Sequence, residues 1–122
     1  MGFSVQTDLS QRLLSVIYSQ IVGIEQARCC FEQVQIGLDE MQPGFRFLTD
    51  LTELESMDTS CALYVQQMMS LCEERGVALI VRIIPDPQKD IGFNIMSRFH
   101  YTGDVLIVTC SNRDEAALAL TD

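Results

Sequence analysis

The most chemically informative stretch of the sequence is Asp58-Thr59-Ser60, three consecutive residues whose side chains carry oxygen atoms. They precede a segment with the apolar spacing of a helix, so they would occupy its first positions. Side-chain oxygens there accept hydrogen bonds from backbone N–H groups that lack a partner within the helix. The same N–H groups and the helix dipole favour an added anion, such as a phosphate on a hydroxyl group. The residues alone therefore leave two interpretations open, an ordinary helix cap or a phosphorylation switch.

The neighbouring residues predict the elements that hold this stretch in place. Residues 45–51 are typical of a buried strand, and residues 52–57 are interpreted as the loop that follows it. From Cys61 to Cys72, apolar residues recur every three or four positions, which indicates one face of an amphipathic helix. Arg75-Gly76 is a typical end signal, so we place this second helix at residues 59–75.

Strand-like segments and helix-like segments also alternate along the rest of the first 84 residues. A hairpin is predicted for residues 2–7 and 12–18, and a first helix with a single apolar stripe for residues 24–41. The nearly continuous apolar run at residues 77–84 is typical of a strand covered on both faces. We therefore expect this run to be the central strand.

The last third of the chain continues the alternation. A short helix is predicted for residues 89–99 and a strand for residues 104–110, and residues 111–115 offer capping-box chemistry for a final helix. Long connections between successive strands indicate right-handed crossovers and parallel pairing. The expected fold is therefore α/β, with a mainly parallel sheet of four to five strands, helices packed on it, and a single domain over residues 1–122.

The charge balance argues against several classes of partner. The 17 acidic and 8 basic residues give a formal net charge of −9, which repels nucleic-acid backbones and anionic lipid head groups. Lys89 is the only lysine, so no lysine patch for nucleic acid can form. No apolar run approaches the roughly 20 residues of a membrane-spanning helix, and the first residues do not resemble an export signal. We therefore expect a cytoplasmic protein with no nucleic-acid partner and no membrane insertion.

Side chains suited to catalysis or metal binding form no recognisable motif. The cysteines number 5, without a CxxC pair, and in a chain without an export signal we expect free thiols. His100 is the only histidine and has no partners at metal-ligand spacing, so we expect no metal and no cofactor. The sequence has no glycine-rich phosphate loop and no hydrolase or metalloprotease motif. We therefore expect that the protein is not an enzyme.

Polar side chains near the expected carboxyl ends of the strands form a second candidate site. Ligands of open parallel sheets bind at that edge. Asp50 lies at the end of one strand and Asp86, Lys89 and Asp90 follow another, so these four residues could form the wall of a pocket. Solvated surface charges explain them about as well. The corresponding alternative function is a carrier of a small apolar ligand or a lipid.

Residues 57–60 precede an amphipathic helix and follow a strand that ends at Asp50, and in this setting they resemble the helix-start motif of STAS domains. These domains form the family of bacterial anti-sigma-factor antagonists, and the expected order of elements is similar along nearly the whole chain. In the family, the motif carries a serine or threonine that a partner kinase phosphorylates. The resemblance therefore implies that Asp58 is the acid of the motif, Thr59 the phosphoacceptor and Ser60 the serine that follows it.

The resemblance also implies a function, although the motif is not matched throughout. Cys61 stands where a glycine is usual and Ala62 where a leucine is common, so we expect a partner packed on this turn to meet the Cys61 side chain. The implied function is a non-catalytic protein-interaction module. Its expected partner is a kinase or an anti-sigma-factor-like protein, and a homodimer is also possible.

Overall fold

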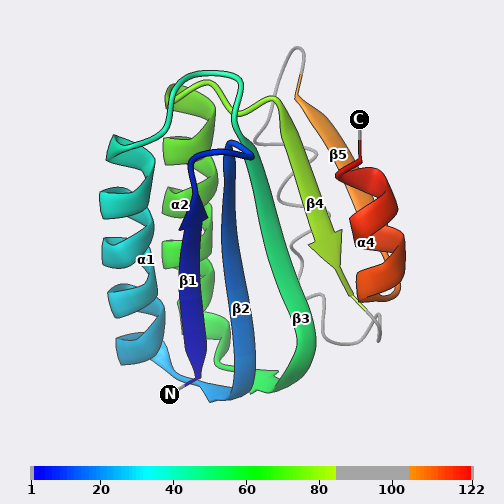
Figure 1. Ribbon diagram of the computed structural model, residues 1–122. Helices are drawn as coiled ribbons and strands as arrows, with labels where there is room; N and C mark the ends of the chain where they lie inside the picture. Colours follow the sequence, from blue (N-terminus) through cyan, green and yellow to red (C-terminus); the bar gives the residue numbers. More distant parts are fainter. Residues whose placement is uncertain (1, 85–104, 122) are drawn as a thin grey trace.

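The computed structural model describes residues 2–84 and 105–121. Their elements are β1 (Phe3–Asp8), β2 (Leu13–Val22), α1 (Ile24–Asp39), β3 (Arg46–Met57), a 3₁₀ turn (Thr59–Cys61), α2 (Ala62–Glu74), β4 (Leu79–Ile83), β5 (Leu106–Cys110) and α4 (Arg113–Ala119). The strands form one five-stranded sheet in the order β1-β2-β3-β4-β5 (Figure 1). β1 is antiparallel to β2, and all other neighbouring strands are parallel. The expected α/β fold with a mainly parallel sheet is confirmed.

Helices cover the two faces of the sheet unequally. α1 and α2 lie side by side on one face, whereas α4 lies on the other face, beside β4 and β5 (Figure 1). The larger core lies beneath α1 and α2 and includes the fully buried Leu14 and Val34. A smaller cluster lies beneath α4 and consists of Val81, Ile83, Cys110 and Ala116. Within the described residues, no helix covers β1 and β2 on the face that carries α4.

The strand sequences match this unequal coverage. In β2, Leu14, Val16 and Tyr18 are buried beneath the helices, and the residues between them are half-buried. This alternation is typical of a strand with one covered face. In β4, every residue from position 80 to position 83 is buried, as expected for a strand with helices on both faces.

The prediction of a loop at residues 52–57 is wrong. These residues extend β3 and pair with the end of β2, so that the last of them lies opposite Val22. Leu54 is buried while Glu53 and Glu55 are exposed, so the stretch has the alternation of a strand with one solvated face. Two register shifts in the pairing of β2 with β3 interrupt that alternation, and the exposed acidic residues gave the stretch the composition of a loop.

The central strand is β3, and the prediction that residues 77–84 would be central is also wrong. β4 lies within that run and pairs with β3 on one side and β5 on the other. It is therefore an internal strand, one position from the centre. Burial of both faces does not require the central position, because α2 and α4 cover the sheet from opposite sides.

Three of the four predicted helices are confirmed, with shifted ends: α1 ends at Asp39 and α2 starts late. α2 begins at Ala62, later than expected, because residues 59–61 form the 3₁₀ turn. α4 is confirmed with its cap, since the Oδ1 atom of Asn112 accepts the N–H of Glu115 at 2.9 Å. The helix predicted for residues 89–99 lies outside the described residues. No helix in the described part of the chain is long and apolar enough to cross a membrane.

Candidate functional site

Asp58 caps the turn through which the chain enters α2. Its backbone is extended, and its Oδ1 atom accepts the N–H of Ser60 at 3.0 Å. Its carbonyl oxygen accepts the N–H of Cys61 at 2.9 Å. Hydrogen bonding to Ser60 holds the pKa of the Asp58 carboxyl below its ordinary value, so this exposed group is negatively charged at neutral pH. Asp58, and not Thr59, therefore supplies the cap of the 3₁₀ turn that leads into α2.

The end of β2 fixes the position of this turn. The N–H of Asp58 donates to the carbonyl oxygen of Val22 at 3.0 Å, and the Sγ atom of Cys61 lies 3.7 Å from the same oxygen. Cys61 is fully buried, so its side chain belongs to the core. The expectation that a partner on the turn would meet the Cys61 side chain is therefore wrong. The replacement of the motif's glycine by cysteine fills core space and leaves the outer surface of the turn unchanged.

The hydroxyl group of Thr59 is available on the outside of the turn. Asp58, Thr59 and Ser60 are all exposed. The Thr59 hydroxyl has no hydrogen-bond partner within residues 2–84 and 105–121. It is therefore free to react or to contact a partner without the loss of a structural hydrogen bond.

Three large apolar side chains are exposed around the same end of the molecule, and we call them the apolar rim: Ile21 at 65%, Ile24 at 44% and Leu63 at 56% exposure. Ile21 belongs to the second-last residue pair between β2 and β3. Ile24 begins α1, and Leu63 is the second residue of α2. α1 also contacts the 3₁₀ turn. Exposed apolar side chains near one end of the molecule are candidates for an interaction surface. The sequence analysis missed the apolar rim, although each residue stands beside an expected element end.

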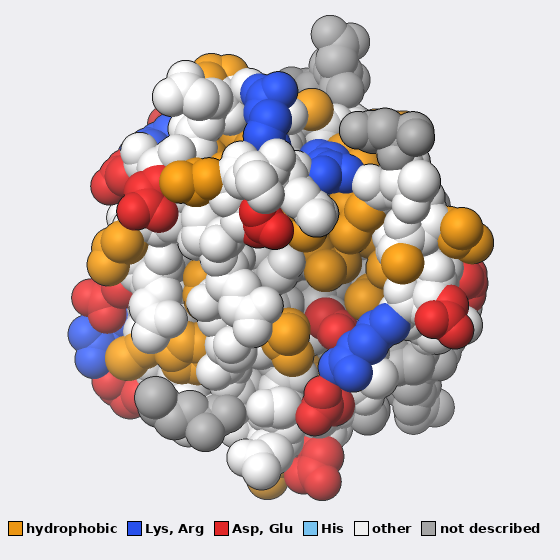
Figure 2. Space-filling view, viewed as in Figure 1, with side chains coloured by type: hydrophobic (Ala, Val, Ile, Leu, Met, Phe, Trp, Pro, Cys, Tyr) orange, Lys and Arg blue, Asp and Glu red, His pale blue; other side chains and the backbone are white. Residues whose placement is uncertain are grey.

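A cluster of charged side chains joins β3 to the start of α4 at the same edge of the sheet. The Nε atom of Arg113 lies 2.8 Å from Oδ2 of Asp50, and its Nη2 atom lies 2.7 Å from Oε2 of Glu53. The backbone N–H and the hydroxyl of Thr52 both donate to Oδ1 of Asp50. Figure 2 shows that basic and acidic side chains lie next to each other on this face, near hydrophobic side chains that gather between the sheet and α4.

The environment of Asp50 keeps it charged although it is almost fully buried. Burial raises the pKa of the Asp50 carboxyl. The hydrogen bonds from Thr52 and the ion pair with Arg113 lower it by more than burial raises it, so the pKa lies below its ordinary value. Only 4% of the Asp50 side chain is exposed, so both of its oxygens serve contacts within the fold. Sequence reasoning found Asp50 but missed Arg113, whose position after β5 was the available signal. The other pocket candidates, Asp86, Lys89 and Asp90, lie outside the described residues.

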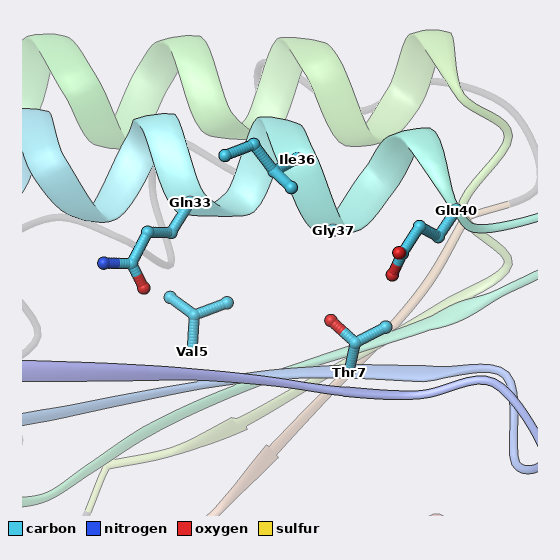
Figure 3. Close-up of a pocket in the computed structure, with 6 residues that line it drawn as sticks. All are labelled: Val5, Thr7, Gln33, Ile36, Gly37 and Glu40. Atoms are coloured by element: carbon cyan, nitrogen blue, oxygen red, sulfur yellow. The ribbon is translucent and has the colours of Figure 1, made fainter.

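One hollow lined by described residues lies at a different place. It is an open hollow of about 180 Å³ between β1 and α1, lined by Val5, Thr7, Gln33, Ile36, Gly37 and Glu40 (Figure 3). Thr7 pairs with Leu14 at the beginning of β2, and Glu40 follows the last residue of α1. The hollow therefore lies toward the amino ends of the parallel strands, away from the Thr59 turn.

The thiols show no sign of a reactive centre. None of the five cysteines forms a disulfide bond, and only Cys29 is exposed. Burial raises the pKa of the Cys30 thiol to about 12, and burial also raises the pKa of the Cys61 and Cys110 thiols. No group of three or more His, Cys, Asp or Glu side chains that could hold a metal ion occurs in the part of the chain that the structure describes.

Comparison with known proteins identifies the fold. No protein-family model matches the chain, and no curated protein matches it. An uncharacterised protein of the DUF3478 family from Shewanella loihica, with a SpoIIAA-like fold, superposes with a TM-score of 0.71 at 15% identity over 98% of this chain and 94% of that one.

Two anti-sigma-factor antagonists are also similar in structure. The antagonist SpoIIAA in its unphosphorylated form has a TM-score of 0.66 at 12% identity, covering 96% of this chain and 94% of that one. An antagonist from Mycobacterium paratuberculosis has a TM-score of 0.63 at 14% identity, covering 98% and 95%. The resemblance to STAS domains that the sequence indicated is confirmed at the level of structure, and the chain has the SpoIIAA-like fold.

Proposed function

We propose that this chain is a non-catalytic protein-interaction module that binds a protein partner through the start of α2, and that phosphorylation of Thr59 switches this binding. The observation that carries the proposal is the exposed Thr59 hydroxyl, which has no hydrogen-bond partner in the described chain and lies at the same end of the molecule as the apolar rim. The fold shared with two anti-sigma-factor antagonists supports the proposal. The proposed partners are a kinase and an anti-sigma-factor-like protein, in the cytoplasm.

The local contacts supply a physical reason for a switch that leaves the fold intact. A phosphate brings roughly −1.5 to −2 charges. The helix dipole tolerates that charge at the start of a helix, and the cap is retained because Asp58 supplies it. A partner that covers the apolar rim, however, would have to bury the phosphate beside the charged Asp58 carboxylate. Phosphorylation should therefore weaken binding with little effect on stability.

Affinity capture from the native host tests the proposal with four baits: the wild type, Thr59→Ala, Thr59→Glu and Thr59→Gln. The glutamate and glutamine variants have nearly the same shape, so a difference between them reports the charge alone. We expect Thr59→Gln to retain the partner and Thr59→Glu to lose it. Gln35→Glu adds the same charge at an exposed position of α1 and serves as the control. Identical partners for all baits would make Thr59 an ordinary residue at a helix start.

A second pair of variants tests whether the apolar rim is part of the same surface. Leu63→Asp and Ile21→Asp place a charge on exposed side chains, so we expect both variants to fold and to lose the partner. Leu118→Asp is the matched control, because Leu118 is 75% exposed on α4. If only Leu118→Asp loses the partner, the binding surface includes α4 and not the apolar rim.

The carrier of a small apolar ligand stays a prediction that the described residues do not test. It places a pocket at the carboxyl ends of the strands, where Asp50 is engaged with Thr52 and Arg113. The hollow between β1 and α1 lies elsewhere and is open. Native mass spectrometry of the purified protein would reveal a retained small molecule if the carrier hypothesis is correct.

A further inference from the structure

β1 is an edge strand without the features that usually protect such an edge. It pairs with β2 over all of its six residues without a register shift, so it has no bulge that would bend it away. It contains neither proline nor lysine, and its only charged residue is Asp8 at its end. A regular, nearly uncharged edge is open to pairing with another strand.

The hydrogen-bonding pattern shows which backbone groups are available. The N–H of Ser19 donates to the carbonyl oxygen of Gly2 at 2.9 Å, so alternate residues starting at Gly2 direct their backbone groups toward β2. The backbone groups of Phe3, Val5 and Thr7 therefore point away from the sheet. They have no hydrogen-bond partner in the described chain.

We propose that two copies of this chain form a homodimer by antiparallel pairing of their β1 strands, with the two-fold axis at Val5. In this register Phe3 of each copy lies opposite Thr7 of the second copy, and Val5 lies opposite Val5. The three outward-facing residues of each strand would then exchange N–H and C=O groups with those of the other strand. The interface is isologous, and the two sheets become one continuous sheet.

The side chains fit this register without electrostatic conflict. On the sheet face opposite α1, Ser4 of one copy lies opposite Gln6 of the second copy, and both residues are exposed in the single chain. Asp8 lies opposite Gly2, so no two like charges face each other across the strands. This matters because the chain has a net charge of −9, and two copies repel one another over most of their surfaces.

The position of α1 leaves room for the second copy. Gly37 faces the sheet so closely that a side chain there would begin 2.9 Å from Leu14 and 3.1 Å from Thr7, so α1 lies over both β1 and β2. Paired strands are about 4.8 Å apart, so the two copies of α1 would lie about 10 Å from each other. That separation is usual for packed helices.

The side of α1 that faces the edge is uncharged around the proposed axis. Gln33 lies above Val5 in the hollow, so Gln33 would meet Gln33 of the second copy at the axis (Figure 3). Cys29 and Ile36 share this side of α1, four residues before and three residues after Gln33. Cys29 is exposed and Ile36 is 67% exposed, so the antiparallel arrangement would bring Ile36 of each copy against Cys29 of the other and cover both.

Sedimentation velocity tests the dimer and its register with two double variants at the same exposed positions. Ser4→Glu/Gln6→Glu places two like-charge pairs across the strands, and we expect it to weaken association by about tenfold. Ser4→Lys/Gln6→Glu places two opposite-charge pairs across the same strands, and we expect it to remain a dimer. Circular dichroism checks that both variants are folded, so a loss of association is not mistaken for unfolding.

Three outcomes would overturn the proposal. If the wild type is monomeric from micromolar to millimolar concentration, β1 does not pair with a second copy. An extended segment of another protein would then be the remaining candidate for pairing with β1. A dimer that both double variants leave unchanged would lie on another surface. A dimer that both variants weaken equally would exclude this register. None of these outcomes depends on Thr59, so the dimer and the proposed switch are tested separately.

Discussion

α2 and α4 begin at the same edge of the sheet and have similar caps, but the residue after each cap is used differently. Asp58 binds the N–H of Ser60 at 3.0 Å, and Asn112 binds the N–H of Glu115 at 2.9 Å. The next residue is the free Thr59 in one case and Arg113, with two ion pairs, in the other. Arg113, at the start of α4, therefore makes contacts that stabilise the fold. The Thr59 side chain, before α2, can be modified or covered without the loss of structural contacts.

The largest effect on the free energy of unfolding should come from removing the Arg113 side chain. Arg113→Ala leaves the buried Asp50 carboxylate without its cation, so we expect the free energy of unfolding to fall by about 1.5–3 kcal/mol, as measured by urea denaturation. Arg28→Ala is the control, because the Arg28–Glu25 pair is largely exposed and should contribute little to stability. Equal losses in the two variants would mean that Arg113 is also only a surface ion pair.

The caps themselves should contribute equally at both helix starts. Asp58→Ala and Asn112→Ala each remove a side chain that accepts a backbone N–H, so we expect both to lower the free energy of unfolding, by about 0.5–2 kcal/mol for Asn112→Ala. Asp58→Asn keeps the acceptor and should cost much less. Thermal denaturation of the three variants measures this. A loss at only one helix would show that the two starts differ in their caps as well.

A smaller effect should appear in the pH dependence of stability. The pKa of Asp50 is lower in the folded chain than its ordinary value, so the unfolded chain binds the proton more tightly. The contribution of Asp50 is therefore complete above its ordinary pKa and is lost as the pH falls through its folded pKa. We expect Asp50→Asn to lose less stability than the wild type on acidification to about pH 3, when urea denaturation is compared with that at pH 7. Asp58 serves as the exposed control for the buried Asp50, because the pKa of its carboxyl is also lowered.

Local patterns were sufficient to predict one helix start and part of the other. Asp58 was found as a capping candidate because capping chemistry is local, and the final helix was found from residues 111–115 for the same reason. The ion pairs of Arg113 join residues more than 50 positions apart in the chain, and the sequence did not indicate which side chains would meet. The order of strands in the sheet brings the interior of β3 beside the start of α4.

The errors in the sheet have a similar origin. Residues 52–57 were expected to form a loop, yet they pair with β2 and remain in the sheet. The exposed Glu53 and Glu55 flank the buried Leu54, which is the alternation of a half-buried strand. The central position was assigned to residues 77–84 by burial alone, although coverage by α2 and α4 buries an off-centre strand equally well. The hydrophobic pattern of a strand indicates which of its faces are covered by helices. It does not indicate the order of the strands, which depends on how the chain connects them.

The smallest effect on stability should be at Thr59, and this is the sharpest test of the comparison with Arg113. Thr59 supplies neither the cap nor a side-chain hydrogen bond in the described chain, so Thr59→Ala should change the free energy of unfolding by less than about 0.5 kcal/mol. Thr59→Glu should have a similarly small effect, because the helix dipole favours a negative charge there while Asp58 opposes it. Urea denaturation of both variants beside Thr59→Gln separates charge from shape. A loss as large as that of Arg113→Ala would mean that Thr59 is also committed to the fold. In that case phosphorylation would disturb the structure itself, and the binding switch would lose its physical basis.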